Sequence, residues 1–384
     1  MPGGARLAVG GATTDAMSER SLSAIVLAAG QGTRMRSARP KPLHMLCGRP
    51  LVRYVLDAVA GCEADRAVVV VGFGADVVIK TLLEDPGPVP LEFVEQRVQN
   101  GTGDAVAVGL TGLPDDDLDT LDADDGDVIV LPGDTPLIRP ETLAGLVREH
   151  RLSGAACTLL TARMVDPTGY GRVVRDKDGR VRRIVEHRDA DDAELAIDEI
   201  NTGVYLFRRG LLAPALRRLT PHNAQAELYV TDVVAVLAEA GHPVVSLVAT
   251  DAEETQGVND RAQLAVAEAE LRHRTNERWM REGVGIVDPA ATYVDTTVVL
   301  APDVVLFPGT VLQGATVVGA GTEIGPATRL SDTRVGERAK VNESVASLAE
   351  IGDDAVVGPF AVLEPGARVG AGVRTGPFYT GGTG

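Results

Sequence analysis

The sequence is poor in cysteine and has no long apolar run. Its three cysteines, Cys47, Cys62 and Cys157, are widely spaced and odd in number, which fits neither a disulfide framework nor a zinc site and predicts a reducing compartment. No stretch is long enough to cross a bilayer, and residues 1–20 lack the basic start and apolar run of a secretory signal. We therefore expect a soluble, cytoplasmic protein with no membrane partner.

Positive charge is also scarce. The chain has 37 Lys and Arg residues against 54 Asp and Glu residues, which gives a net charge of −17 and argues against a general surface for nucleic acid. Any polyanion that this protein handles must be small and held in a local basic pocket. The length of 384 residues is enough for two domains.

Short apolar runs alternate with amphipathic stretches between residues 23 and 247. The apolar runs predict strands at 23–29, 66–72, 91–96, 127–134, 156–164 and 202–207. The amphipathic stretches predict helices at 49–62, 142–153, 210–219 and 229–241. Strands separated by helices in this way favour a mostly parallel sheet covered on both faces, and ligands of such sheets bind beyond the carboxyl ends of the strands.

The rest of the chain has a different texture. Residues 260–280 contain neither Gly nor Pro and predict one long helix that links two domains. Beyond Val284, pairs of an aliphatic residue and a glycine recur six residues apart, as in Val318-Gly319 and Ile324-Gly325. This period is typical of a parallel β-helix; the alternative is a glycine-rich β-sandwich.

One stretch combines glycines with clustered cations at the end of a predicted strand. Leu27 to His44 reads LAAGQGTRMRSARPKPLH. Gly30 and Gly32 allow close approach of backbone N–H groups to phosphate oxygens, and Arg34 and Lys41 supply charge for a triphosphate. The stretch is neither a Walker A loop nor the dinucleotide fingerprint. A purely structural loop is the alternative.

These residues carry a specific resemblance. The stretch is similar to the LxxGxGTRMxSxxPKxLH signature of sugar-nucleotide pyrophosphorylases, and most closely to the uridylyltransferase half of the bifunctional N-acetylglucosamine-1-phosphate uridylyltransferase/glucosamine-1-phosphate acetyltransferase (GlmU) family. Further motifs follow in order, among them QRVQNGTGDA, LPGDTPLI, GYGRVVRD, RIVEHRDA, EINTGVYLF, NAQAELYVTD and GVNDR. The similarity covers about residues 23–261 and continues into the helix and the repeats.

The resemblance implies a fold and a division of the chain. The fold is α/β, with a Rossmann-like (GT-A-like) nucleotidyltransferase domain followed by a truncated left-handed parallel β-helix. The implied segments are a disordered extension at 1–20, the nucleotidyltransferase domain at 21–258, a linker helix at 259–283 and an incomplete β-helix at 284–384.

The resemblance also implies roles for individual residues. The nucleotide would contact Leu27, Ala28, Ala29, Gly30, Gly32, Thr33, Gln96, Gln99, Gly101 and Thr102. Catalysis at the phosphates would use Arg34 and Lys41. The Mg²⁺ ligands would be Asp134 and Asn259, a pair suited to a hard cation. The sugar would contact Gly171, Glu186, Asn201 and Tyr229.

The implied reaction joins UTP and N-acetylglucosamine 1-phosphate into UDP-N-acetylglucosamine and pyrophosphate, a step that serves peptidoglycan and cell-wall synthesis. Two alternatives stay open. The enzyme can act on another sugar 1-phosphate or nucleotide, or the protein can be a non-catalytic sensor of sugar nucleotides.

Several site residues have simpler interpretations. Asp134 can cap the turn before Pro136, Glu186 can form a surface ion pair with its neighbours, and Asn259 can cap a helix. Gln96 and Gln99 can be solvated. The acidic run Asp115–Asp127 lacks the glycine and glutamate positions of an EF-hand, so we expect a solvated loop there.

The second activity of the resembled family is not expected. Its catalytic residues lie mostly beyond the last residue of this sequence, and Glu364 stands where the family has an arginine for the sugar phosphate, a charge reversal at an anion site. The resemblance implies a homotrimer formed through the β-helix, and we expect this assembly without acetyltransferase activity.

Overall fold

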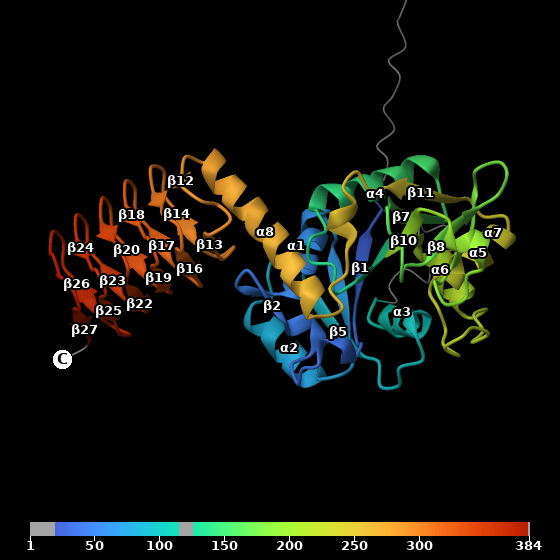
Figure 1. Cartoon of the computed structure of the whole chain (residues 1–384). Coiled ribbons are helices and arrows are strands. Elements are labelled where there is room, and N and C mark those ends of the chain that lie inside the picture. The colour runs from blue at the N-terminus through green and yellow to red at the C-terminus, as the bar shows by residue number, and fades with distance from the viewer. Residues whose placement is uncertain (1–19, 115–125, 383–384) are drawn as a thin grey trace, which may run out of the picture.

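The structure, a computed structural model, describes residues 20–114 and 126–382 (Figure 1). An α/β part is followed by a long diagonal helix and then by a stack of short strands. Apart from Arg20, the predicted N-terminal extension lies outside the described residues, and so does the acidic run up to residue 125. Among the described residues, no helix combines the length and the apolarity needed to span a membrane.

The core of the first part is one mixed sheet. Its main strands are β1 (Leu22–Ala28), β4 (Arg66–Val71), β5 (Leu91–Glu95), β6 (Asp127–Pro132), β7 (Cys157–Arg163), β10 (Glu199–Arg208) and β11 (Val244–Val248), in the order β11-β7-β10-β6-β1-β4-β5. Only β10 runs antiparallel to its neighbours in this path. The hairpin β8 (Arg172–Arg175) and β9 (Val181–Val185) attaches to β10. The predicted strands are confirmed; β8, β9 and β11 are additional.

Helices cover both faces of this sheet. One face packs against α1 (Leu51–Gly61), α2 (Ala75–Glu84) and α4 (Pro140–Ser153). The other packs against α3 (Thr102–Leu110), α6 (Arg209–Leu216) and α7 (Asp232–Glu239). Alternation along β1 explains the two layers, because Ala24 and Val26 point to the first face and Ile25 to the second. The short elements are η1 (Thr33–Met35), η2 (Lys41–Leu43), β2 (Met45–Leu46), β3 (Arg49–Pro50), α5 (Asp192–Leu195) and η3 (Ala252–Thr255).

The expectation of a solvated acidic loop is wrong for its last residue. Asp127 begins β6 and is 1% exposed. Its carboxylate accepts a hydrogen bond from Nε of Arg151 at 3.0 Å and lies 3.4 Å from Nε2 of His150. Burial acts to raise the pKa of Asp127, but its interactions with His150 and Arg151 outweigh burial, so the pKa is lowered.

The predicted long helix is α8 (Arg261–Arg281). It begins at Asp260, whose carboxylate accepts a hydrogen bond from the backbone N–H of Gln263 at 2.8 Å. Near its end, Trp279 joins the interior of the strand stack. Asn276 is fully buried and donates from Nδ2 to the carbonyls of Pro289 and Thr292, at 2.9 and 3.0 Å. These contacts fix the helix to the first coil.

The strand stack is a three-faced parallel β-helix, as expected for the left-handed β-helix fold, and the sandwich alternative is excluded. The first sheet contains β12 (Gly285–Ile286), β15 (Val305–Leu306), β18 (Glu323–Ile324), β21 (Lys340–Val341) and β24 (Val356–Val357). The second contains β13 (Tyr293–Val294), β16 (Val311–Gln313), β19 (Arg329–Ser331), β22 (Val345–Ser347), β25 (Val362–Leu363) and β27 (Thr380–Gly381). The third contains β14 (Val299–Leu300), β17 (Val317–Val318), β20 (Arg334–Val335), β23 (Glu350–Ile351) and β26 (Arg368–Val369).

The first coil is also fastened directly to the α/β part. The turn between β2 and β3 reaches it, because the carbonyl of Cys47 accepts a hydrogen bond from the backbone N–H of Thr296 at 3.1 Å. The hydroxyl of Tyr54 lies 2.9 Å from the hydroxyl of Thr296, and the N–H of Cys47 donates to Glu268 of α8 at 2.9 Å. The linker helix and the β-helix are thus docked rather than tethered.

Candidate functional site

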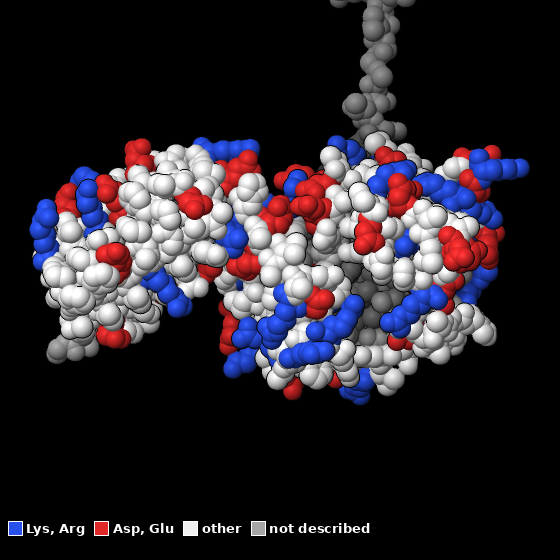
Figure 2. Space-filling view, in the orientation of Figure 1, with Lys and Arg blue, Asp and Glu red and all other residues white. Residues whose placement is uncertain are grey.

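A cavity of about 470 Å³ opens beyond the carboxyl ends of β1 and β6. Thirteen of the eighteen residues predicted for the site line it, namely Leu27, Ala28, Ala29, Gly30, Lys41, Gln96, Gln99, Gly101, Thr102, Asp134, Gly171, Glu186 and Asn201. The other five, Gly32, Thr33, Arg34, Tyr229 and Asn259, do not line it. In Figure 2, Lys and Arg side chains gather along the lower side of the α/β part, whereas charges of both signs are scattered over the β-helix.

The glycine-rich turn after β1 brings Lys41 close to the strand end. Gly32 has a φ of +61°, and a Cβ there would lie 2.7 Å from Cβ of Lys41. Glycine therefore suits this position both because its backbone adopts a positive φ without strain and because it has no Cβ to meet Lys41. Gly30 has open space around its Cα, which leaves its backbone accessible to a ligand.

Three segments that are distant in the sequence meet at one ammonium group. Nζ of Lys41 forms an ion pair with Oδ2 of Asp134 and lies 2.9 Å from Oδ1 of Asn259. Arg34 is exposed, and its Nη2 donates to the same oxygen of Asn259 at 2.8 Å. The helix-cap interpretation of Asn259 is wrong, because Asp260 is the capping residue. The carboxylate of Asp134 forms an ion pair with Lys41, so the interpretation of Asp134 as a turn cap alone is not supported.

Asp134 and Asn259 present the oxygen donors that a small hard cation prefers. A carboxylate and an amide oxygen converge on the ammonium group of Lys41. Gly257 lies beside both side chains, because a Cβ there would be 3.5 Å from Oδ1 of Asp134 and 3.8 Å from Nδ2 of Asn259. Within residues 20–114 and 126–382, no group of three or more His, Cys, Asp or Glu residues gathers as a metal site. A Mg²⁺ ion fits this donor set if phosphate oxygens and water complete its coordination.

Two amide side chains shape the opposite side of the cavity. Gln96 is buried, and its Nε2 donates to the carbonyl of Gly101 at 3.2 Å and to Asp104 at 2.7 Å. Gln99 is exposed, but its Nε2 donates to the carbonyl of Ala29 at 2.8 Å and so holds the glycine-rich turn. The solvated interpretation is wrong for Gln96, and the Gln99 side chain is held in place.

The start of α3 is packed against the loop before α7. Gly101 has a φ of +106°, and a Cβ there would lie 2.5 Å from the carbonyl oxygen of Leu228. The hydroxyl of Thr102 accepts a hydrogen bond from the N–H of Val230 at 3.0 Å. This side of the cavity is therefore rigidly built.

The remaining wall comes from β8, β9 and β10. The N–H of Asn201 donates to the carbonyl of Gly171 at 2.8 Å, and its Nδ2 donates to the hydroxyl of Tyr205 at 2.7 Å. Burial raises the pKa of Glu186, and the carboxylates of Asp189 and Asp232 act in the same direction. Glu186 lines the cavity, and no ion pair of it is found within the described residues, so the surface ion-pair interpretation is not supported.

Tyr229 lies outside the lining. Its ring is buried, and its hydroxyl donates to Oε1 of Gln225 at 2.9 Å. Burial, together with nearby carboxylates, raises the pKa of Tyr229 to about 12. It supports the loop next to the cavity.

Sequence reasoning missed part of the lining. The residues that it left out include Tyr170, Thr202, Tyr205, Glu227 and Thr231. Each lies within a motif quoted for the resemblance, one to four residues from a predicted site residue. The alternation of strand side chains offered a signal for one of them, because residues four apart on a strand share a face, as Asn201 and Tyr205 do.

Comparison with known proteins supports the sequence resemblance. Residues 23–281 match the family model described as nucleotidyl transferase. Proteins named bifunctional protein GlmU are similar to this chain: that of Thermobifida fusca (strain YX) is 48% identical over 284 residues, which cover 74% of this chain and 57% of the relative. That of Shouchella clausii (strain KSM-K16) is 45% identical over 280 residues, 73% of this chain and 59% of the relative. The chain therefore matches less than two thirds of the length of these relatives.

Proposed function

Because the chain belongs to the nucleotidyl transferase family, we propose that the cavity joins UTP to N-acetylglucosamine 1-phosphate and releases pyrophosphate. The observation that carries this proposal is the convergence of Lys41, Asp134 and Asn259 beside the glycine-rich turn. The product, UDP-N-acetylglucosamine, would serve cell-wall synthesis, as the resemblance implies. The functional division that we propose is a nucleotidyltransferase domain at 21–258, a linker helix at 259–283 and a β-helix at 284–384.

Charge neutralisation and positioning supply the catalysis. The sugar phosphate is already an anion, so its attack on the α-phosphate of UTP needs no general base. Lys41 and Arg34 neutralise the charge that grows on the α-phosphate and on the leaving pyrophosphate, and the cavity walls hold the two substrates in line. Asp134 and Asn259 would hold Mg²⁺, which would supply Lewis-acid polarisation of phosphate oxygens.

One end of the cavity recognises the nucleotide and the other end recognises the sugar. Gln96 and Gln99 present amide groups that donate and accept, which suits the imide edge of uracil. The Gly101–Thr102 backbone lies beside them, and the turn Leu27–Thr33 receives the phosphates. At the other end, Gly171, Glu186 and Asn201 contact the sugar, and Tyr229 supports that wall from behind.

A substrate panel tests the proposal. Purified protein with Mg²⁺, UTP and N-acetylglucosamine 1-phosphate should release pyrophosphate faster than with glucose 1-phosphate or with other nucleoside triphosphates. Faster release with a different pair would correct the substrate and keep the reaction. Binding of a UDP-sugar without turnover of any pair would favour the sensor alternative.

The β-helix has the surface of an assembly module. Val345 and Val362 are 49% and 40% exposed on its second sheet, and the rings of Phe360 and Phe378 stack at 5.3 Å with 51% and 74% of their surface exposed. Exposed apolar surface of this kind is typical of an interface, which supports a homotrimer formed through this face. Light scattering of the whole chain tests it, and a monomer at micromolar concentration would contradict it.

Residues 284–384 are not proposed to acetylate glucosamine 1-phosphate. They contain no histidine, and the exposed carboxylate of Glu364 repels a phosphate. A thiol assay for coenzyme A, run with acetyl-coenzyme A and glucosamine 1-phosphate, tests this point. Release that depends on the sugar phosphate would contradict it.

A further inference from the structure

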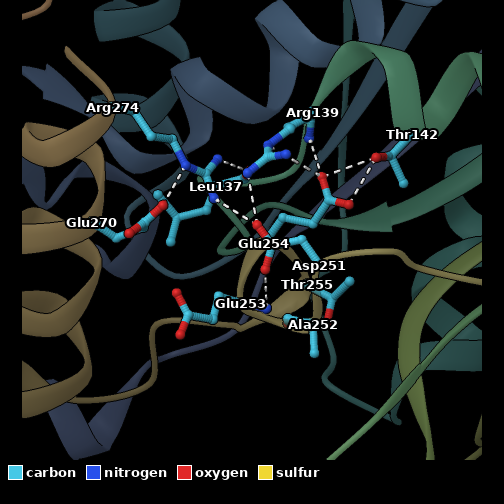
Figure 3. A network of polar contacts seen from close by, with 10 residues as sticks. All are labelled: Leu137, Arg139, Thr142, Asp251, Ala252, Glu253, Glu254, Thr255, Glu270 and Arg274. Carbon is cyan, nitrogen blue, oxygen red and sulfur yellow. Dashed lines mark hydrogen bonds and ion pairs between the residues drawn. The ribbon is translucent and has the colours of Figure 1, made fainter. Parts of the chain in front are cut away.

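The segments that bear Asp134 and Asn259 are joined by a polar network outside the cavity lining (Figure 3). Glu254 of η3 points at the start of α4, where its carboxylate accepts hydrogen bonds from the backbone N–H of Arg139 at 3.1 Å and from the hydroxyl of Thr142 at 2.8 and 2.9 Å. Glu254 is 2% exposed. A carboxylate buried this deeply is costly unless it is bonded, so these contacts hold η3 firmly against α4.

A second set of contacts ties α8 to the same place. Nη1 of Arg274 donates to the carbonyl of Leu137 at 2.8 Å, and its Nε donates to Glu270 at 2.6 Å. Asp251 lies between two arginines, with its Oδ2 2.7 Å from Arg139 and 3.6 Å from Arg274. Figure 3 shows the three elements, α4, η3 and α8, meeting at these side chains.

The network connects directly to the site. Leu137 follows Asp134 by three residues, and Glu254 precedes Asn259 by five. Between them, the N–H of Val258 donates to the carbonyl of Asp134 at 2.8 Å, and the side chains of Leu137 and Val258 pack in one small apolar cluster. The distance between the two donor oxygens therefore depends on how η3 and α8 are held.

We propose that Glu254 and Arg274 are positioning residues, which fix the separation of Asp134 and Asn259 and thereby set the affinity of the site for a divalent cation bound with a nucleoside triphosphate. This inference rests on the proposed function. Neither residue lines the cavity, so both act through the segments that they hold. Loss of such supporting contacts typically lowers metal affinity by about 10- to 100-fold.

The test is the binding of Mn²⁺ in the presence of UTP, without sugar phosphate, followed by electron paramagnetic resonance of the free ion. Glu254→Ala should weaken Mn²⁺ binding by about tenfold. Glu254→Gln keeps a side-chain oxygen for the N–H of Arg139, so its affinity should stay within about threefold of the unaltered protein. Glu253→Ala removes the same charge from the same element, but its side chain is exposed and points away from the network; it should bind as the unaltered protein does.

Arg274→Ala gives an independent arm. It should also weaken Mn²⁺ binding by about tenfold, whereas Arg281→Ala should not, because Arg281 is 77% exposed and pairs only with Glu277 of its own helix among the described residues. If Glu254→Ala fails to fold, as judged by circular dichroism, Arg274→Ala and Thr142→Val carry the test. Thr142→Val removes one donor to Glu254 and should weaken binding.

The outcomes distinguish failure of the proposed function from failure of the positioning role. An unaltered protein that binds no Mn²⁺ with UTP would contradict the proposed function. An unaltered protein that binds, with Glu254→Ala and Arg274→Ala that bind equally well, would overturn the positioning role alone. A lowered melting temperature without a change in affinity would overturn it too, and so would equal losses for Glu254→Gln and Glu254→Ala, since that pattern reports charge rather than geometry.

Discussion

Nζ of Lys41 lies 2.9 Å from Oδ1 of Asn259, although 218 residues separate them in the sequence. The contact joins Lys41, which lines the cavity, to the segment just before α8. It also means that the cation of Lys41 and the donor set proposed for Mg²⁺ occupy one small region, where both would act on the phosphates.

Removal of Lys41 tests the charge of this region. We expect Lys41→Ala to lower kcat by about 10²- to 10³-fold and to change KM less, because the charge acts mainly on the phosphates in the transition state. Arg34→Ala should act in the same direction. Steady-state pyrophosphate release measures both. Lys80→Ala, at a residue that is 78% exposed on α2, serves as the control and should leave the rate unchanged. An increase in KM with kcat unchanged would indicate that the cations serve ground-state binding.

Asp134→Asn tests the cation site. The substitution removes the only carboxylate of the proposed donor pair, so the Mg²⁺ concentration for half-maximal rate should rise by at least about tenfold. A titration of Mg²⁺ at saturating substrates measures it. Asp178→Asn, in the turn between β8 and β9, is the matched control. An unshifted Mg²⁺ dependence for Asp134→Asn would remove this residue from the cation site.

Gly101→Ala tests the packing beside the nucleotide. The new Cβ would meet the carbonyl of Leu228 at 2.5 Å in a backbone conformation with φ of +106°, so we expect a loss of about 2–4 kcal/mol in the free energy of unfolding and weaker UTP binding. Gly179 also has a positive φ, +80°, but a Cβ there would meet nothing within 4 Å. Gly179→Ala should therefore lose only about 1–2 kcal/mol. Urea unfolding compares them, and equal losses would show that the clash is relieved.

Glu186 should make stability depend on pH. Burial raises its pKa in the folded protein, so the folded state favours the protonated acid. This contribution to stability is fully present below the ordinary value of 4.5 and is lost as the pH rises through the raised pKa. Glu186→Gln should thus increase the free energy of unfolding at pH 7.5 and have a smaller effect at pH 4.5. Urea unfolding without ligand measures this, with Glu92→Gln, at an exposed position of β5, as the control. A variant destabilised equally at both pH values would contradict the argument.

Much of the fold could be predicted from the sequence because its periodicities are strong. The β-branched runs of β1 and β4 and the aliphatic-glycine repeats after Val284 each fit one structure. The helices α2 and α3 were missed: α3 is short and includes two glycines, Gly103 and Gly109, that suit close packing on the sheet rather than helix formation. Asp127 was misread because composition alone does not show which acidic residue is buried beside an arginine, as Asp127 is beside Arg151.

The site could be predicted where single motifs carry it. The turn after β1 and Asp134 after β6 follow from the rule on strand ends. The N-cap of α8 could have been assigned to Asp260 rather than Asn259 from the sequence, since Asp260 and Gln263 have the spacing of a capping pair. The network around Glu254 could not be predicted, because its members come from three elements whose meeting depends on tertiary packing.

Trp279 and Asn276 seal the first coil of the β-helix against α8, while Cys47 and Tyr54 fasten that coil to the α/β part. Within the described residues, the strands of each later coil pair with those of the coils beside it. Loss of a coil at the far end of the stack would therefore leave the contacts of the first coil with α8 and with the α/β part unchanged. Coils can thus be added or removed only at the end of the β-helix that lies away from α8.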